Sequence, residues 1–443
     1  MEGSFPNQLT NVNGRLFFRA SDGTSGSELW QSNGTEAGTI LVKDIFPGTR
    51  TSFPDQLTNV NGTLFFEASD PNTGNELWKS DGTQAGTVVV KDIFPGPSNS
   101  FPGNLTNVNG TLFFEASDPN TGDELWKSDG TQAGTVLVKD IRPGVDGSSP
   151  DQLRNVNGTL FFSAFDPNTG NELWQSDGTQ AGTVLVKDIF PGVDDSSPDQ
   201  LTNVDGRLFF RANDGTSGSE LWKSDGTEAG TALFKDISPG AGSSSLTALT
   251  NVNGTLFFGA DNGTTGRELW QSDGTQAGTI LVKDIRPGVF GQFWDQLTNV
   301  NGTLFFGAND GIHGTELWAL LFCSDIDGDA LCDDEDPCKS FSNTLPLVIS
   351  NFSGIPDECL CGDFDGNHTL TGGDAQAINQ CAGFVRFDCD LARDDVDGNG
   401  VLTGNDAARV NKVAGFVDPP YLLTCPRRPE GTCGGDTGVS CDF

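Results

Sequence analysis

Two acidic loops in the last fifth of the sequence carry oxygen-bearing groups at the spacing of a metal-binding loop. One runs from Asp363 to Asp374 and the other from Asp395 to Asp406. Positions 1, 3, 5 and 12 offer side-chain oxygens, position 7 offers a backbone carbonyl, and position 9 is a threonine that acts through water. Because calcium takes six to eight oxygen ligands, the pattern predicts one Ca²⁺ in each loop; two solvated acidic turns are the alternative. The predicted ligands are Asp363, Asp365, Asn367, Thr369, Thr371 and Asp374 in the first loop, and Asp395, Asp397, Asn399, Val401, Thr403 and Asp406 in the second.

A third acidic run lies upstream, at residues 325–336, and is flanked by cysteines. Its aspartates fit ligand positions 1, 3, 5, 9 and 12, which predicts at least one further calcium site. A cation there would neutralise carboxylates that otherwise repel one another, and would order this junction. A flexible acidic linker is the alternative. The predicted ligands are Asp325, Asp327, Asp329, Asp333 and Asp336.

These acidic segments resemble two kinds of calcium-binding module. Each of the two loops is followed by an apolar-patterned segment, at residues 375–384 and 407–416, that predicts a helix. The order loop, helix, linker, loop, helix over residues 361–417 resembles a type I dockerin, and the third run resembles a thrombospondin type 3 repeat. The dockerin resemblance implies docking onto a cohesin-like protein; an internal cap or the docking unit of another system is the alternative.

Cysteine content and charge restrict the cellular setting. All ten cysteines lie after residue 322. An even number in a short tail predicts disulfides and an oxidising, extracellular compartment, with a zinc site as the alternative. The formal charge of -36 argues against nucleic acid or an anionic membrane as partner. No apolar run reaches membrane-spanning length, so we expect no membrane insertion. No signal peptide precedes Ser4, so the leader of a secreted protein has been removed or was never part of this chain.

Before the acidic tail, one sequence unit recurs at constant spacing. Glu-Leu-Trp ends at Trp30 and then every 48 residues as far as Trp318. In the second copy, segments 56–60, 63–68, 75–79 and 87–93 predict four short strands, with an Asn-Gly hairpin turn between the first two. This is the size of a β-propeller blade, whose Phe and Trp side chains should pack between neighbouring blades. Seven copies predict a mainly β fold, a seven-bladed β-propeller; an open solenoid is the alternative.

The last copy departs from the pattern after Trp318, where the fourth strand of the other copies is missing. We expect either a three-stranded last blade or a strand from upstream of this chain. The segment from Glu76 to Thr83 and its counterparts resemble the bacterial ELWxxDGT-repeat proteins, which implies a secreted or surface propeller of no particular activity. The expected regions are the propeller at 1–322, an Asp/Cys-rich calcium-binding linker at 323–360, a small α-helical dockerin-like calcium-loop domain at 361–417 and a Cys-containing tail at 418–443.

Catalysis has little support, because an active site needs unlike groups at one place and the repeat supplies the same groups seven times. Repeated glutamates such as Glu76 are expected to pair with strand residues such as Lys91, and His313 stands alone in a turn. Breaks in the repeat are better candidates for a site. One adds aromatic residues that form either a stacking platform for a sugar ring or a plug near the closure of the propeller: Phe290, Phe293 and Trp294. The position after each Phe pair also varies, which either tunes a ligand surface or is drift on a solvated edge: Arg19, Glu67, Glu115, Ser163, Arg211, Gly259 and Gly307.

The sequence thus predicts a secreted or cell-surface calcium-binding interaction protein that is not an enzyme. Its propeller would present a binding or scaffold surface, with a polysaccharide among the candidate ligands, and its tail would dock a partner protein. One rival is a carbohydrate-active enzyme, a polysaccharide hydrolase or lyase that works through paired carboxylates. The other is a purely structural surface or stalk protein.

Overall fold

The computed structural model describes residues 3–288, 293–321 and 347–349, and every regular element in these ranges is a β-strand. The strands form seven four-stranded sheets in which neighbours in sequence are neighbours in the sheet. The chain is therefore mainly β, with four strands per 48-residue repeat, as predicted. The helical domain predicted at residues 361–417 lies outside the described residues.

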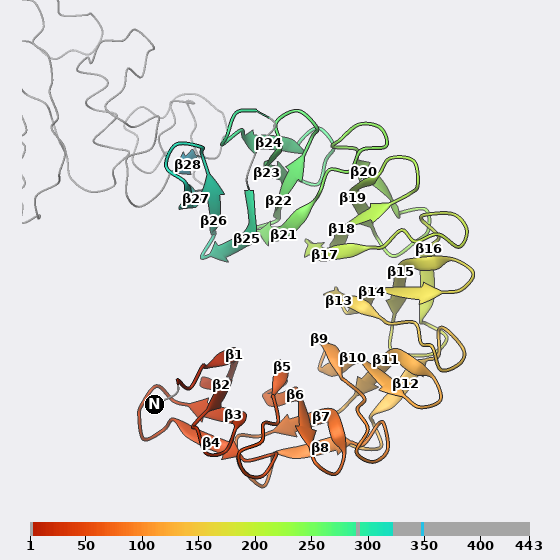
Figure 1. The fold of residues 1–443 in the computed structure, drawn as a ribbon. Helices are drawn as coiled ribbons and strands as arrows, with labels where there is room; N and C mark the ends of the chain where they lie inside the picture. The colour runs from red at the N-terminus through yellow and green to blue at the C-terminus, as the bar shows by residue number, and fades with distance from the viewer. Residues whose placement is uncertain (1–2, 289–292, 322–346, 350–443) are drawn as a thin grey trace, which may run out of the picture. The chain divides into compact units, whose positions relative to one another are not determined.

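Each sheet takes its four strands in the order of the repeat (Figure 1). The first strands are β1 (Asn7–Val12), β5 (Asp55–Val60), β9 (Gly103–Val108), β13 (Asp151–Val156), β17 (Asp199–Val204), β21 (Thr247–Val252) and β25 (Phe293–Val300). The second strands are β2 (Arg15–Ser21), β6 (Thr63–Asp70), β10 (Thr111–Asp118), β14 (Thr159–Asp166), β18 (Arg207–Asn213), β22 (Thr255–Asp261) and β26 (Thr303–Asn309). The third strands are β3 (Ser27–Ser32), β7 (Gly74–Ser80), β11 (Gly122–Ser128), β15 (Gly170–Ser176), β19 (Ser219–Ser224), β23 (Arg267–Ser272) and β27 (Thr315–Leu321). The fourth strands are β4 (Ile40–Lys43), β8 (Val88–Lys91), β12 (Val136–Lys139), β16 (Val184–Lys187), β20 (Ala232–Lys235), β24 (Ile280–Lys283) and β28 (Leu347–Ile349).

The six sheets from β1 to β24 belong to one compact unit of the chain. Their first strands contact one another in succession, from β1 with β5 to β17 with β21. Figure 1 shows these first strands on the inner side of a curved row of sheets and the fourth strands on its outer side. A given position of the repeat therefore recurs at the same place on each successive sheet, so that equivalent residues form rows.

The Phe pair of each second strand holds neighbouring sheets together. Successive side chains of a strand point to opposite faces. Phe66 packs in one cluster with Phe17 of the preceding sheet, whereas its neighbour Phe65 packs with Phe114 of the next sheet. Burial of each of these rings contributes about 1.5–3 kcal/mol. The prediction that the Phe and Trp side chains pack between neighbouring blades is confirmed for these six sheets.

An Asn-Gly turn joins the first two strands, as predicted. Asn61 and Gly62 have φ angles of 51° and 85°, and two successive positive φ angles are what a type I′ turn requires. The side chain of Asn59 accepts a hydrogen bond from the Gly62 N–H at 2.9 Å and donates one to the backbone carbonyl of Asn11, one repeat earlier, at 3.1 Å. The same inter-sheet bond, here called the asparagine ladder, recurs from Asn107 to Asn59, Asn155 to Asn107, Asn203 to Asn155 and Asn251 to Asn203.

The seventh sheet differs from the expectation of a three-stranded blade or a strand from upstream. Its fourth strand is β28, which pairs antiparallel with β27, with Ile349 opposite Ala319 and Leu347 opposite Leu321. The sequence pattern missed this strand because Leu-Val-Ile lacks the Lys-Asp-Ile ending of the other copies. It also lies within residues 323–360, which composition assigned to a linker. Strand pairing uses backbone groups, so the repeat motif is not needed to complete the sheet.

Candidate functional site

The glutamate of each Glu-Leu-Trp segment lies in the third strand. Its carboxyl group accepts hydrogen bonds from the segment that links the fourth strand to the next sheet. Glu76 accepts hydrogen bonds from the backbone N–H groups of Ile93 and Phe94, at 2.9 and 3.2 Å, and from Ser100 Oγ at 2.6 Å. The buried copies are Glu28, Glu76, Glu124, Glu172, Glu220 and Glu268. In the five copies from Glu28 to Glu220 the residue 24 positions later is a serine that bonds to the glutamate, and we call this contact the Glu–Ser clamp; the corresponding residue after Glu268 is Gln292.

Burial makes the glutamate of the clamp a weaker acid than an exposed glutamate. It raises the pKa of Glu76 to about 7, although the hydrogen bonds from Ser100, Ile93 and Phe94 act in the opposite direction. The Ser100 hydroxyl also lies 3.3 Å from the carbonyl oxygen of Asn75. It can therefore donate to that carbonyl and accept from a protonated Glu76, so both protonation states of the glutamate have hydrogen-bond partners.

Lys91 is not the partner of Glu76, contrary to the prediction. Its Nζ donates to the carbonyl oxygen of Thr135 in the next sheet at 2.8 Å and lies 5.3 Å from the ring centroid of Trp126. The sequence placed the two charges in one strand pair, but Lys91 stands opposite Leu77, the neighbour of Glu76. Since successive side chains alternate between faces, the two charged groups point away from each other.

The connection held by the clamp presents one side chain outward. Ser52 donates its N–H and Oγ to Glu28 at 2.9 and 2.5 Å, and Pro54 is buried. Phe53 stands between them with a φ of 50° and is 60% exposed. A bulky residue in the left-handed region costs about 1–3 kcal/mol, and burial does not offset this cost here.

The same position carries an exposed Phe in the first three sheets and a serine in the next three. Phe5 and Phe101 are 75% and 58% exposed, with φ angles of 44° and 48°. Ser149, Ser197 and Ser245 have φ angles of 49°, 47° and 49°. The backbone shape is thus constant and the side chain is not. We call Phe5, Phe53 and Phe101 the aromatic row.

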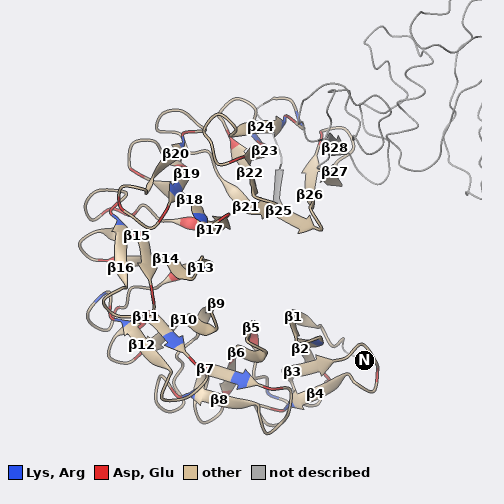
Figure 2. Ribbon diagram, turned by 180° about the vertical axis from the view of Figure 1, so that it is seen from behind, with Lys and Arg blue, Asp and Glu red and all other residues tan. Residues whose placement is uncertain are grey.

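The variable position after each Phe pair lies beside this row. Glu67 and Arg211 stand opposite Asp55 and Asp199, each the first residue of its first strand and two residues after the Phe or Ser position. Figure 2 marks acidic residues on β17 and basic ones on β18. The variable row comprises Arg19, Glu67, Glu115, Ser163, Arg211 and Gly259 in the six sheets.

Polar contacts at the start of the variable row cross from one sheet to the next. Arg19 donates from Nε to Asn7 Oδ1 at 2.7 Å, and its Nη1 lies 3.3 Å from Oδ2 of Asp55 in the second sheet. Asn75 donates from Nδ2 to Glu67 Oε1 at 2.6 Å. Burial raises the pKa of Glu67 above its usual value. Asp55 and Glu67 therefore both have partners within the protein.

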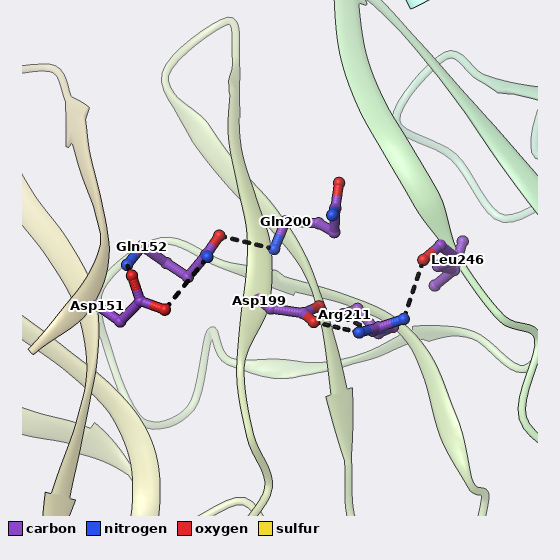
Figure 3. A network of polar contacts seen from close by, with 6 residues as sticks. All are labelled: Asp151, Gln152, Asp199, Gln200, Arg211 and Leu246. Atoms are coloured by element: carbon purple, nitrogen blue, oxygen red, sulfur yellow. Dashed lines mark hydrogen bonds and ion pairs between the residues drawn. The ribbon is translucent and has the colours of Figure 1, made fainter. Parts of the chain in front are cut away.

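A second polar network links the fourth, fifth and sixth sheets along the variable row, and Figure 3 shows it from close by. Arg211 forms an ion pair with Asp199 and donates from Nη1 to the carbonyl oxygen of Leu246 at 3.1 Å. The backbone N–H of Gln200 donates to Gln152 Oε1 at 3.2 Å. These contacts connect three successive sheets.

Glu115 is the residue of the variable row best suited to proton transfer. It is half-buried and accepts a hydrogen bond from Asn104 Nδ2 at 3.3 Å. Burial, and then the nearby charges of Asp123 and Asp151, raise its pKa to about 7. Such a carboxyl beside two others can act as a general acid or base. The only sequence signal for it was its place at a variable position.

The predicted calcium ligands at 325–336, 363–374 and 395–406 lie outside the described residues, as does Phe290. Phe293 and Trp294 open strand β25, and only their backbone is described. Within the described ranges, no group of three or more His, Cys, Asp or Glu side chains is arranged to hold a metal ion. Those ranges also contain no helix with the length and apolar character needed to cross a membrane.

His313 does not stand alone in its turn, contrary to the prediction. Its Nδ1 lies 2.6 Å from Asp310 Oδ2, and its backbone N–H donates to Asp310 Oδ1 at 2.8 Å. The pairing is local, because the two residues lie three positions apart in one turn. Such a contact is expected of an aspartate that caps a turn with its side chain.

Comparison with known proteins gives no family for this chain. No family model matches it, and no curated protein matches it. Among solved structures it is similar to a puromycin hydrolase, with 14% identity and a TM-score of 0.42 over 71% of this chain and 51% of that one. It is also similar to a prolyl endopeptidase, with 13% identity and a TM-score of 0.44 over 78% of this chain and 54% of that one. Prolyl oligopeptidase B from Galerina marginata matches with 14% identity and a TM-score of 0.39 over 80% of this chain and 51% of that one. The chain spans about half the length of these proteins, and likeness at this level assigns it no activity.

Proposed function

We propose that the chain is a secreted or cell-surface calcium-binding interaction protein whose repeats form a seven-bladed β-propeller. One observation carries this proposal. Six sheets repeat the same turn and the same buried glutamate, whereas the variable row changes from basic to acidic to neutral between sheets. A constant frame with a variable polar edge is typical of a recognition scaffold.

The tail supplies the docking half of the proposal. The dockerin-like segment at 361–417 holds two calcium ions and binds a cohesin-like protein or another docking partner, and the run at 325–336 holds at least one more ion. The ELWxxDGT resemblance supports a bacterial extracellular or surface location. The acidic charge argues against a nucleic-acid partner. A purely structural role remains the alternative, and it requires neither ligand nor partner.

The full chain tests this proposal on a glycan array and in a pull-down, each with calcium and with a chelator. We expect calcium-dependent capture of a partner protein, lost in a variant with Asp363→Ala and Asp395→Ala. Asp194→Ala, which removes an exposed carboxylate of the propeller, is the matched control. Absence of both glycan binding and partner capture under either condition would contradict the proposal.

Glu115 favours a second candidate, a carbohydrate-active enzyme. A carboxyl with a pKa of about 7, close to Asp123 and Asp151, suits general acid chemistry at a glycosidic bond. In this reading Glu115→Gln abolishes the release of reducing ends or unsaturated products from polysaccharides, while Glu36→Gln, at an exposed site, leaves it unchanged. Failure of the wild-type chain to cleave any polysaccharide would remove this candidate.

A further inference from the structure

The aromatic row has no evident part in stabilising the fold. Phe5, Phe53 and Phe101 are each more than half exposed. Each stands at a positive φ, a strained conformation for a bulky residue, and serine satisfies the same backbone shape in the next three sheets. A strained, exposed aromatic at one repeat position in three successive sheets indicates a role other than folding.

The backbone beneath the aromatic row is fixed. Next to Phe101, Ser100 donates its Oγ to Glu76 at 2.6 Å and accepts a hydrogen bond from the Ser117 N–H at 2.7 Å, and Pro102 is buried. A side chain carried on such a base loses little conformational freedom when a ligand covers it, and this favours binding. The Glu–Ser clamp therefore presents the ring in a defined direction.

Carboxylates of the variable row stand beside these rings. Asp55 lies two residues after Phe53 and opposite Glu67. A Cβ added at Gly103 would meet Glu115 Oε2 at 3.4 Å and the carbonyl oxygen of Phe101 at 3.9 Å. Each of these two sheets thus combines an exposed ring with hydrogen-bond acceptors.

This combination fits a neutral polyhydroxyl ligand better than a basic peptide. A basic peptide is attracted by free negative charge, but Arg19 already pairs with Asp55, and burial raises the pKa of Glu67 above its usual value and that of Glu115 to about 7. Hydroxyl groups can still donate to the remaining lone pairs of these carboxylates. The electron-rich face of a Phe ring attracts the partly positive C–H groups on the face of a sugar ring.

We propose that the aromatic row is a polysaccharide-binding site, in which Phe5, Phe53 and Phe101 stack on sugar rings while Glu67 and Glu115 accept hydrogen bonds from sugar hydroxyls. The proposal rests on the recognition function proposed above and names its ligand class and residues. One aromatic per sheet suits a ligand that is itself a repeating chain. Phe293, five 48-residue periods after Phe53, holds the same position in the seventh repeat.

The test is affinity electrophoresis of the full chain through gels that contain hydroxyethylcellulose, xylan, mannan or a soluble β-1,3-glucan. Phe53→Ser and Phe101→Ser copy the residue that the chain itself uses at 149 and 197, so the fold should tolerate them. We expect retardation by at least one polysaccharide, weakened about 2- to 10-fold by each substitution. Val145→Ser, which removes another exposed apolar side chain, should leave binding unchanged.

The outcomes separate this inference from the function on which it rests. Equal binding by wild type and by the Phe53→Ser, Phe101→Ser double variant overturns the aromatic row as the site. Absence of polysaccharide binding together with calcium-dependent capture of a partner overturns this inference alone. Retention on oligolysine that is lost in the double variant identifies a basic ligand and likewise overturns it. Absence of any ligand or partner contradicts both proposals.

Discussion

Replacement of Glu76 by glutamine isolates the proton linkage of one Glu–Ser clamp. The carboxyl is buried, and burial raises its pKa to about 7 from a model-compound value of 4.5. The Ile93 N–H and Ser100 Oγ bond to Oε2 of Glu76, and the Phe94 N–H bonds to Oε1. A glutamine whose NH₂ group replaces Oε2 keeps the Phe94 bond and donates to Ser100, whose hydroxyl can then donate to Asn75, but it loses the Ile93 bond. Glu76→Gln is therefore uncharged at every pH, like the protonated glutamate, at the cost of one hydrogen bond that does not depend on pH.

The sign and size of the effect follow from linkage. The folded protein binds the Glu76 proton more tightly than the unfolded chain does, so the stabilisation is fully present below pH 4.5 and is lost as the pH rises past 7. At about 1.4 kcal/mol for each pKa unit, one clamp loses roughly 2–3 kcal/mol of unfolding free energy between pH 5 and pH 8. The glutamine variant does not titrate at this position, so its unfolding free energy lacks this pH-dependent loss.

Guanidinium denaturation of wild type and Glu76→Gln, at pH 5 and pH 8 with calcium and ionic strength fixed, measures the difference. Between pH 5 and pH 8 the unfolding free energy of wild type should fall by about 2–3 kcal/mol more than that of the variant, and hydrogen exchange at the Ile93 amide of wild type should speed up in parallel. Glu36→Gln, at an exposed position, should follow wild type at both pH values. If wild type and Glu76→Gln share one pH dependence, Glu76 is ionised in the folded state throughout and the reasoning is wrong.

Three further outcomes test the structure and the tail. Lys91→Met should lower the unfolding free energy by about 1–2 kcal/mol, measured by denaturation, because Lys91 loses its bond to the Thr135 carbonyl and its place over Trp126. Gly86→Ala should cost about 1–3 kcal/mol, because its Cβ would meet Asp81 Oδ1 at 2.1 Å. Combining it with Asp81→Ala should cost less than the two single changes added together. Chelation of calcium should change the far-UV circular dichroism of the full chain, and calcium but not magnesium should restore it.

The sequence was informative wherever structure is set by local, repeated chemistry. The 48-residue period, the Asn-Gly turns and the Phe and Trp packing between sheets follow from side-chain alternation and turn geometry. All three are present in the first six sheets, except that the turn of the fifth sheet is Asp205-Gly206. The variable position was also visible as a break in repetition. The raised pKa of Glu115 at this position could not be predicted, because one of its causes is the charge of Asp151 in the next repeat.

Other features depend on contacts that no local pattern reveals. The partner of Glu76 is Ser100, 24 residues away across a sheet boundary, and not the nearer lysine. The positive φ of Phe53 arises because its neighbours on both sides are anchored, and the residue itself favours no such conformation. Strand β28 joins its sheet through backbone pairing alone, so no motif marks it in the sequence.

The asparagine ladder constrains how this chain can change its length. Each rung joins a side chain to a main-chain carbonyl one period earlier, and every residue type provides such a carbonyl. The hydrogen bond between two successive sheets can therefore form whichever copy of the repeat comes before. Recombination that removes or inserts one whole period leaves equivalent joints, whereas a deletion of a few residues breaks the rungs on both sides of it. Interchangeable units of this kind allow a lineage to alter the number of copies in whole steps, and the uninterrupted 48-residue spacing is the mark that such a history would leave.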